Sequence, residues 1–342
     1  MFFGWVTFTP LLSSGAVALC VMLALLLALW IDRRWGEPPV ALHPVVWMGH
    51  YLRVCGQRTV RYRPAWAFML GAVAWCVGAT ITGLMALGLQ TLLFWQIRRL
   101  GWSAGWADWA SAVMLMGFFA WTLKCMLSWR MLRGEVLAVE AALAESLSAG
   151  RERLSWLVSR DTALLSAAEV RESAIESLAE NLNDSVVAPI FWFVLFGLSG
   201  AAVYRFANTA DAMWGYRGVR HGQHWEWAGK WAARADDVLS WVPARLTALL
   251  IVAITRGVTL KTLAAEAQRT PSPNSGWPMA AMALALGIRL GKPGVYTLNA
   301  AGRVPEAVDT IKTIKKASNV LLAQAFIAFI AMLLIVFYGV AR

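Results

Sequence analysis

The chain has 342 residues, of which 59% are hydrophobic and only 15% charged, and its formal net charge is +11. Soluble domains average roughly 45–50% apolar and 25% charged residues, so the composition excludes an ordinary soluble protein and indicates an integral membrane protein. The basic residues are interleaved with apolar runs and form no separate basic domain. This argues against nucleic acid and favours anionic lipids or anionic substrates as partners.

Four long apolar runs predict transmembrane helices, because about 20 apolar residues cross a bilayer core. They are residues 1–31, 65–97, 109–127 and 317–341. The first has no basic residues ahead of its apolar stretch, so we interpret it as a retained helix and not as a cleaved signal. The third is long enough if the ammonium group of Lys124 reaches toward the membrane surface.

The charged connections predict the orientation of these helices. Segment 32–64 carries six Arg and Lys124–Asp184 carries seven Lys or Arg, whereas 98–108 carries only two Arg. By the positive-inside rule, the N-terminus and 98–108 lie outside, and 32–64 and the chain from about 124 lie inside. The final helix then exits with Arg342 outside. Residues 128–184 form a cytoplasmic helical segment, in which 134–159 is an amphipathic helix with a turn near Gly150.

Residues 185–290 do not have the pattern of uninterrupted transmembrane helices. The run 185–204 is interrupted by Pro and Gly, and the next candidate, 236–254, contains two Asp, a Pro and an Arg. Such residues are costly at membrane depth unless they line a cavity within the protein, so this region predicts broken or re-entrant helices. The fold class is therefore an all-α integral membrane protein with about four transmembrane helices, these broken helices and a cytoplasmic helical segment. We treat residues 1–342 as a single membrane domain.

Four carboxylates spaced four residues apart form a ladder on one side of a predicted helix. They are Glu172, Glu176, Glu180 and Asp184, about 6 Å apart per step. Like charges at this spacing repel and destabilise an isolated helix. The ladder therefore predicts a bound divalent cation with oxygen ligands, such as Mg²⁺. A solvated acidic helix face is the alternative.

This segment and others in order along the chain resemble the CobD/CbiB family, the adenosylcobinamide-phosphate synthases of cobalamin biosynthesis. The matching blocks span about residues 25–300. They include Gly36-Glu37-Pro38, His43-Pro44-Val45, Ser159-Arg160-Asp161-Thr162, Ile175-Glu176-Ser177-Leu178-Ala179-Glu180-Asn181, Gly215-Tyr216-Arg217, Pro243-Ala244-Arg245, Ser272-Pro273-Asn274-Ser275 and Lys292-Pro293-Gly294. Two positions depart from the family pattern, since Glu37 replaces the usual Asp and Ser185 the usual Gly.

The resemblance implies an amide-forming ligase that joins (R)-1-aminopropan-2-ol, or its O-phosphate, to a carboxylate of the corrinoid adenosylcobyric acid, giving adenosylcobinamide or its phosphate. Amide formation from a carboxylate is uphill in water, so ATP as co-substrate would activate it. That chemistry needs Mg²⁺, cations for the phosphates, and a base near the amine. The expected location is the inner (plasma) membrane, multi-pass, with the active site facing the cytoplasm. Other cobalamin-assembly membrane enzymes are candidate partners. The phosphorylation state of the amine, the base, the number of spans within 185–290 and the oligomeric state stay open.

Candidate site residues follow from the ladder, the matching blocks and side-chain chemistry. Catalytic candidates are Glu176, Glu180, Asp184 and His43, and metal candidates are Glu176, Glu180, Asp184, Asp236 and Asp237. Guanidinium groups bind phosphate and carboxylate bidentately, and the turn at 272–276 can present backbone N–H groups to an anion. Candidates for binding substrate or phosphate are Arg160, Arg171, Asn181, Asn208, Asp211, Arg217, Arg234, Arg245, Ser272, Asn274 and Ser275.

Each assignment has a structural alternative. An Arg can form an ion pair or contact lipid, Arg171 can offset the charge of the ladder, and the Asp236–Asp237 pair can begin a helix. Asn181 and Asn208 can cap helices, and His43 can be purely structural. The sequence has no Walker A motif and no G-x-G-x-x-G.

Two other function classes compete with the ligase. One is a corrinoid transporter or an AmpE-like membrane regulatory protein, because intramembrane charges and broken helices suit both. The other is a membrane transferase that binds a polyprenyl diphosphate through Mg²⁺. The density of paired acidic and Arg motifs argues against a regulator. The lack of an internal repeat argues against a carrier, and the lack of a D-D-x-x-D motif argues against the transferase.

Overall fold

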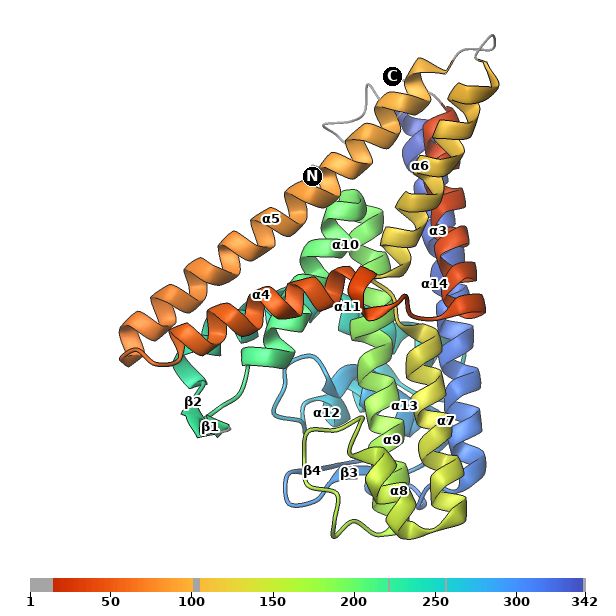
Figure 1. Cartoon of the computed structure of the whole chain (residues 1–342). Helices are drawn as coiled ribbons and strands as arrows, with labels where there is room; N and C mark the ends of the chain where they lie inside the picture. The colour runs from red at the N-terminus through yellow and green to blue at the C-terminus, as the bar shows by residue number, and fades with distance from the viewer. Residues whose placement is uncertain (1–14, 101–104, 221, 256, 341–342) are drawn as a thin grey trace. The chain divides into compact units, whose positions relative to one another are not determined.

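The computed structural model describes residues 15–100, 105–220, 222–255 and 257–340, which are almost entirely helical (Figure 1). Within these residues, four helical stretches are long and apolar enough to cross a membrane: Pro64–Arg99, Trp106–Glu145, Ala167–Trp214 and Ala307–Leu334. The prediction of an all-α membrane protein is confirmed. Of the expected first span, residues 1–14 lie outside the described residues and the rest lies in helix α3 (Gly15–Trp35).

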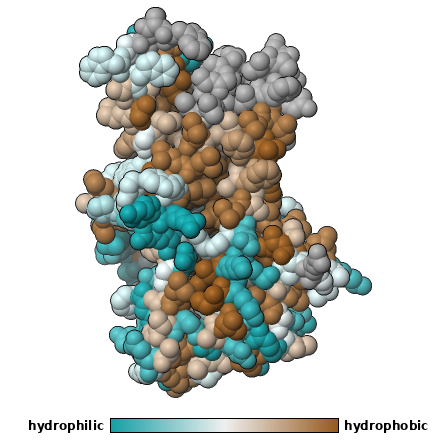
Figure 2. Space-filling view, turned by 90° about the vertical axis from the view of Figure 1, so that its right-hand side faces the viewer, coloured by the Kyte–Doolittle hydropathy of each residue, from teal (hydrophilic) through white to brown (hydrophobic). Residues whose placement is uncertain are grey.

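The surface agrees with this assignment. Many large apolar side chains are exposed, among them Leu84 on the second predicted span and Met114 on the third. The face seen in Figure 2 carries a broad apolar area beside patches of hydrophilic side chains. Exposed apolar area of this extent is rare on soluble proteins and is expected where a protein contacts lipid.

The chain forms two compact units, each built from discontinuous segments. Unit one comprises residues 1–128, 188–239 and 325–342, and unit two comprises 129–187 and 240–324. Among the described residues, four long helical stretches contribute to both units. They are Trp106–Glu145, Ala167–Trp214, helix α11 (Glu226–Ala253) and helix α14 (Ala307–Val340).

Unit one is a helical bundle with a short β-hairpin. Helix α10 packs against α4 and α5, and α3 packs against α6. Close approach depends on glycine, since a Cβ at Gly71 would lie 2.2 Å from the carbonyl oxygen of Ala228. The further elements of this unit are a 3₁₀ turn (Val40–Leu42), α4 (Pro44–Thr59), α5 (Pro64–Arg99), α6 (Trp106–Lys124), α10 (Ala188–Trp214), β1 (Val219–Arg220) and β2 (Gln223–His224).

The break expected within 185–204 occurs at Gly197. Its φ of 69° and ψ of −156° interrupt α10, and a side chain there would collide with Gln90. The buried Gln90 replaces the lost helical bond, because its Oε1 accepts from the backbone N–H of Leu198 at 2.8 Å. A π-helical turn (Asn183–Val187) precedes α10. The predicted broken helix is thus present, within a run long enough to cross a membrane.

Unit two surrounds helix α9 (Ala167–Leu182), which packs against α7, α8, α13 and β3. The turn expected near Gly150 lies instead at Ser146, whose hydroxyl accepts from the backbone N–H of Ala149 and caps the next helix. Gly150 lies inside that next helix, where it approaches Leu143 so closely that a Cβ would lie 2.7 Å from its Cδ1. The elements of this unit are α7 (Trp129–Glu145), α8 (Leu147–Leu154), α9, α12 (Leu260–Ala267), α13 (Gly276–Leu286), β3 (Leu290–Lys292) and β4 (Tyr296–Leu298).

A tight turn joins β3 and β4. The backbone N–H of Val295 donates to the carbonyl of Lys292 at 3.0 Å, and Gly294 has a φ of 72°. Pro293 and Gly294 therefore occupy the second and third positions of a type II turn, which favour these residue types. The two strands pair antiparallel in the register Lys292 with Tyr296.

Candidate active site

Helix α9 is fixed at its start by a capping box. The hydroxyl of Ser166 accepts from the N–H of Glu169, whose side chain accepts in return from the N–H of Ser166. Downstream of this cap, one stripe of the helix carries positions 173, 176, 177, 180 and 181. Their side chains line a single polar cavity.

The polar cavity has a volume of about 200 Å³. The loop after α8 closes one side, α13 contributes Met279, and the β3–β4 hairpin contributes Lys292 and Tyr296. The full lining is Leu157, Val158, Ser159, Arg160, Ser173, Glu176, Ser177, Glu180, Asn181, Met279, Lys292 and Tyr296. Of the residues predicted from the sequence, the cavity brings together Arg160, Glu176, Glu180 and Asn181.

Charge is buried on one wall of this cavity. Glu176 is 4% exposed, and Nη2 of Arg160 approaches its Oε2 at 3.4 Å while also donating to the hydroxyl of Ser173. Oε1 of Glu176 and Nε of Arg160 are buried and have no hydrogen-bond partner. Because an unsatisfied buried polar atom is costly, these two atoms mark where a bound ligand would gain most.

Lys292 and Tyr296 were missed by the sequence reasoning. The hydroxyl of Tyr296 donates to Sδ of Met279 at 3.8 Å, and burial together with the nearby negative charges of Glu176 and Glu180 raises the pKa of Tyr296. Tyr296 is therefore a neutral hydrogen-bonding group at physiological pH. The Lys292-Pro293-Gly294 block was the available signal, since Pro-Gly predicts the turn that places both side chains on one hairpin.

The carboxylate ladder does not act as one group. Glu172 is buried and paired with Arg289, whose Nη2 lies 3.1 Å from Oε1. Asp184 lies in the π-helical turn, where Asn183 donates to it at 2.8 Å. Within the described residues, no three His, Cys, Asp or Glu side chains are grouped as a metal site. Only Glu176 and Glu180 of the ladder line the cavity.

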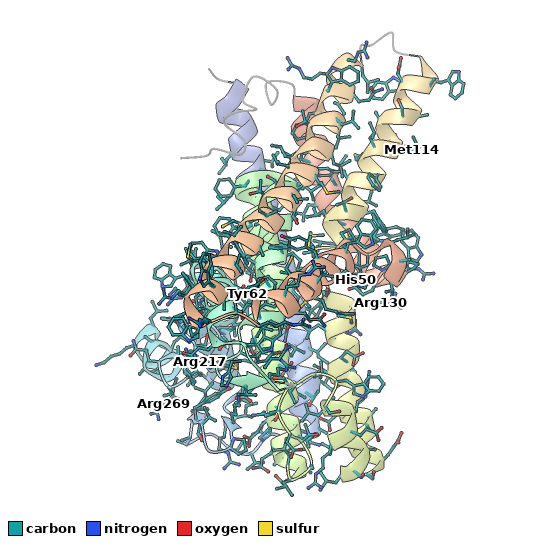
Figure 3. The ribbon with its side chains drawn as sticks, turned by 60° about the vertical axis from the view of Figure 1, so that its left-hand side comes forward. His50, Tyr62, Met114, Arg130, Arg217 and Arg269 are labelled. Atoms are coloured by element: carbon teal, nitrogen blue, oxygen red, sulfur yellow. The ribbon has the colours of Figure 1, made fainter. Side chains whose placement is uncertain are left out.

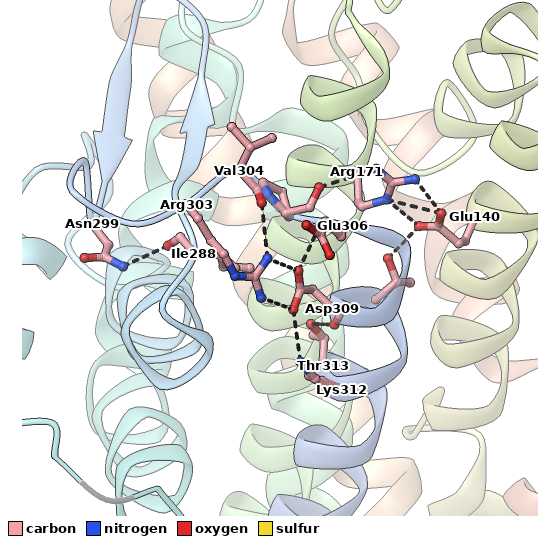
Figure 4. A network of polar contacts seen from close by, with 12 residues as sticks. Glu140, Arg171, Ile288, Asn299, Arg303, Val304, Glu306, Asp309, Lys312 and Thr313 are labelled. Atoms are coloured by element: carbon pink, nitrogen blue, oxygen red, sulfur yellow. Dashed lines mark hydrogen bonds and ion pairs between the residues drawn. The ribbon is translucent and has the colours of Figure 1, made fainter.

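Two predicted arginines of unit two have partners elsewhere. Arg171 donates to both oxygens of Glu140, at 2.6–3.2 Å, and to the carbonyl of Pro305 (Figure 4). Arg245 donates to Asn274 at 3.0 Å and to the carbonyls of Trp241 and Pro273. Neither residue lines the polar cavity, and their role in binding anions stays a prediction.

The turn at 272–276 uses its amides internally. The hydroxyl of Ser272 accepts from the backbone N–H groups of Asn274 and Ser275, both at 3.2 Å. The side chain of Asn274 in turn accepts from Arg245. These bonds order the turn in the absence of an anion, so anion binding by this loop stays a prediction.

His43 belongs to a buried charge cluster in unit one. Its Nδ1 accepts from the N–H of Val45, which leaves the proton on Nε2, 3.0 Å from Glu37. Lys124 is fully buried, and its Nζ lies 2.7 Å from Glu37 and 3.8 Å from Asp32. The expectation that Lys124 reaches toward the membrane surface is wrong, because two carboxylates hold its ammonium group inside the bundle.

The other predicted residues of unit one lie near the end of α10 and on α11. Asn208 donates to Asp236 at 3.5 Å, and Arg217 is close enough for its positive charge to act on Asp237. Arg217 is exposed (Figure 3). Asp211 is half-buried and Arg234 is exposed. Two pairs of predicted residues therefore lie near each other in this unit: Asn208 with Asp236, and Arg217 with Asp237.

Comparison with known proteins assigns the chain to a family. The family model described as CobD/Cbib protein matches residues 25–322. A probable cobalamin biosynthesis protein CobD from Methanothermobacter thermautotrophicus is 39% identical over 80% of this chain and 85% of its own length. The corresponding protein from Pyrococcus abyssi is 40% identical over 86% and 89%, and the cobalamin biosynthesis protein CobD from Rhizobium meliloti is 35% identical over 85% and 90%. No solved structure matches the chain. The chain therefore belongs to the CobD/CbiB family of cobalamin biosynthesis proteins.

Proposed function

We propose that this protein catalyses ATP-dependent amide-bond formation between (R)-1-aminopropan-2-ol, or its O-phosphate, and a carboxylate of adenosylcobyric acid. Family membership supports a role in cobalamin biosynthesis. The observation that carries the specific reaction is the polar cavity, where two carboxylates, Glu176 and Glu180, lie beside two cations, Arg160 and Lys292. A small molecule with an ammonium group at one end and a phosphate at the other is complementary to this arrangement.

The size of the cavity supports assigning it to the amine. Pockets for drug-sized ligands have volumes of about 300–1,000 Å³, whereas this cavity has about 200 Å³. It is too small for a corrinoid or for ATP, and it suits a small aminoalcohol or its phosphate. Because it holds both carboxylates and cations, the phosphorylated amine is the form we favour.

The reaction requires a base. ATP phosphorylates the corrinoid carboxylate, and the amine nitrogen then attacks the acyl carbon and displaces phosphate. The ammonium group must first lose a proton, which a carboxylate in the cavity can accept. Glu176 is our candidate, because one of its oxygens is buried without a partner.

Magnesium is the alternative occupant of the carboxylate pair. Mg²⁺ is commonly bound by one or two carboxylates together with substrate phosphates, so Glu176 and Glu180 fit it only with phosphate oxygens as further ligands. There it would neutralise charge on a transferred phosphoryl group. The two roles separate experimentally, since a lost metal ligand raises the Mg²⁺ concentration needed for activity and a lost base does not.

The test is a reaction with purified protein in detergent. Adenosylcobyric acid, ATP and Mg²⁺ are combined with either amine, and the corrinoid is followed by mass. We expect a mass increase equal to the amine minus water, together with ADP formation, and a faster reaction with the phosphorylated amine. An unchanged corrinoid with both amines, while the protein still binds adenosylcobyric acid, would instead support the transporter. We expect the protein in the plasma membrane with this cavity on the cytoplasmic side, where ATP is available.

A further inference from the structure

Unit one contains a second cavity, distinct from the polar one in size and character. It is a groove of about 780 Å³ between α4, α5, α6 and α10. Its lining is almost entirely apolar and includes Trp47, Met85, Phe118 and Phe206. Nothing in the proposed amide chemistry uses it.

The groove presents few hydrogen-bonding demands. The hydroxyl of Tyr51 donates to the carbonyl of Ala74 at 2.8 Å, and that of Thr122 donates to the carbonyl of Phe118 at 2.8 Å. Two of the three hydroxyls on the wall are therefore satisfied within the protein, and the third belongs to Thr82. A hydrocarbon occupant would leave the hydrogen bonds of Tyr51 and Thr122 intact.

The position of the groove matches the hydrocarbon region of a bilayer. Helices α5 and α6 lie in stretches apolar enough to cross a membrane, and the groove extends along α5 from Gly78 to Leu89. Those eleven steps span roughly 16 Å at about 1.5 Å per residue. This is close to half of a hydrocarbon core of about 30 Å, the depth of one lipid leaflet.

Basic residues lie on α4, beside and beyond the part of the helix that lines the groove. Trp47 is 49% exposed on α4, and His50, one turn further on, is also exposed (Figure 3). Arg58 is exposed and continues the stripe of Trp47 and Tyr51 along the helix. Arg58 lies seven residues, or about 10 Å, beyond Tyr51, and Arg61 and Arg63 follow in the turn before α5. The stretch of α4 that leads away from the groove therefore attracts negative charge.

We propose that the groove binds an acyl chain of an anionic phospholipid, whose headgroup is held by His50 and Arg58. Charge complementarity along α4 selects the headgroup, and the apolar wall takes the chain. A second copy of the chain, inserting an apolar helix into the groove, would produce a different result in the test below.

The test uses vesicles of phosphatidylcholine that contain the purified protein and a trace of spin-labelled lipid. The label is placed near the end of the acyl chain, on phosphatidylglycerol or on phosphatidylcholine, and the motionally restricted fraction is measured. We expect phosphatidylglycerol to be preferred about fivefold, the factor that one basic side chain near an anionic surface contributes. Equal restriction of the two lipids by the parent protein would overturn the proposal.

Matched variants locate the effect. Thr82→Phe fills the groove and should reduce the restricted fraction of phosphatidylglycerol by more than half, whereas Leu84→Phe, on an exposed face of the same helix, should not. Arg58→Gln should remove the headgroup preference, whereas Arg53→Gln, on another exposed face of α4, should retain it. Circular dichroism confirms that each variant is folded.

Two outcomes contradict the groove assignment. If Thr82→Phe and Leu84→Phe behave alike, the restricted lipid lies elsewhere on the protein surface. If Thr82→Phe instead halves the mass of the protein in its detergent complex and leaves lipid restriction unchanged, a second copy of the chain fills the groove.

Discussion

Glu176 and Glu180 have the same side chain as Glu169 on the same helix, but only the first two line the polar cavity. We expect Glu176→Gln and Glu180→Gln each to lower kcat by about 10²–10⁴-fold, the range for loss of a positioned acid or base. Glu169→Gln is the control, because Gln preserves its capping role. Initial rates with adenosylcobyric acid and saturating amine measure the effect. If all three variants were equally active at low Mg²⁺, the carboxylates would have no part in the chemistry.

Glu37 tests how unit one accommodates a buried ammonium group. Burial by itself would raise the pKa of Glu37, but hydrogen bonds and charge from His43 and Lys124 outweigh burial and hold it below its ordinary value. Glu37→Gln leaves Lys124 with the more distant Asp32. Breaking a buried ion pair costs about 3–5 kcal/mol. Because Asp32 remains near Lys124, we expect Glu37→Gln to lower the free energy of unfolding by an amount near the lower end of this range.

The pH dependence of this loss has a definite sign. A carboxyl whose pKa is lower in the folded state stabilises the protein above its unfolded pKa of about 4.3, and this contribution is lost as pH falls through the folded value. The difference in apparent melting temperature between the parent and Glu37→Gln should therefore be large at neutral pH and narrow below pH ~4. Tryptophan fluorescence in detergent measures it, with the exposed Glu152→Gln as control. A difference that widens on acidification would contradict the ion-pair account.

At the scale of elements, the β3–β4 hairpin matters because it supplies Lys292 and Tyr296 to the polar cavity. Gly294 has a φ of 72°, a conformation that a β-branched residue adopts only with strain. Gly294→Val should therefore distort the turn and lower kcat/KM by at least tenfold, while α9 keeps its cap and its packing. Steady-state kinetics with either amine measure the change.

Gly257 provides a matched control for the hairpin. It also has a positive φ, of 90°, and open space around its Cα, but it precedes α12 and does not line the cavity. Gly257→Val should thus carry a similar backbone cost and leave kcat/KM near that of the parent. Similar losses in both variants would mean that general destabilisation, and not placement of Lys292 and Tyr296, causes the effect.

Local sequence signals predicted some elements well and others not at all. The Pro and Gly residues of 185–204 predicted a broken helix, and the break occurs at Gly197. The sequence could not show that Gln90, over a hundred positions earlier, replaces the missing backbone bond. In the same way, the stripe of α9 predicted Glu176 and Glu180 in the site, whereas the partners of Glu172 and Arg171 are Arg289 and Glu140, on other elements. Pairing between distant segments depends on packing, which no local pattern encodes.

At the scale of the whole molecule, composition was sufficient to predict a membrane protein, because the apolar fraction is a property of the entire chain. The distribution of basic residues among the connecting segments further predicts how the helices are oriented in the membrane. It places 32–64 and 124–184 in the cytoplasm and 98–108 outside. The structure adds suitable positions for testing this, since Arg58, Arg98 and Ser148 are all exposed.

Single cysteines at these three positions, in a background without the four native cysteines, test the orientation in intact cells. A membrane-impermeant thiol reagent should label Arg98→Cys directly, and it should label Arg58→Cys and Ser148→Cys only after permeabilisation. The physical reason is that Lys and Arg in short loops are retained on the cytoplasmic side during insertion. Labelling of Ser148→Cys but not Arg58→Cys in intact cells would place the polar cavity's unit outside. The amide ligase would then lack access to cytoplasmic ATP, and that orientation would contradict the proposed function as well as the predicted topology.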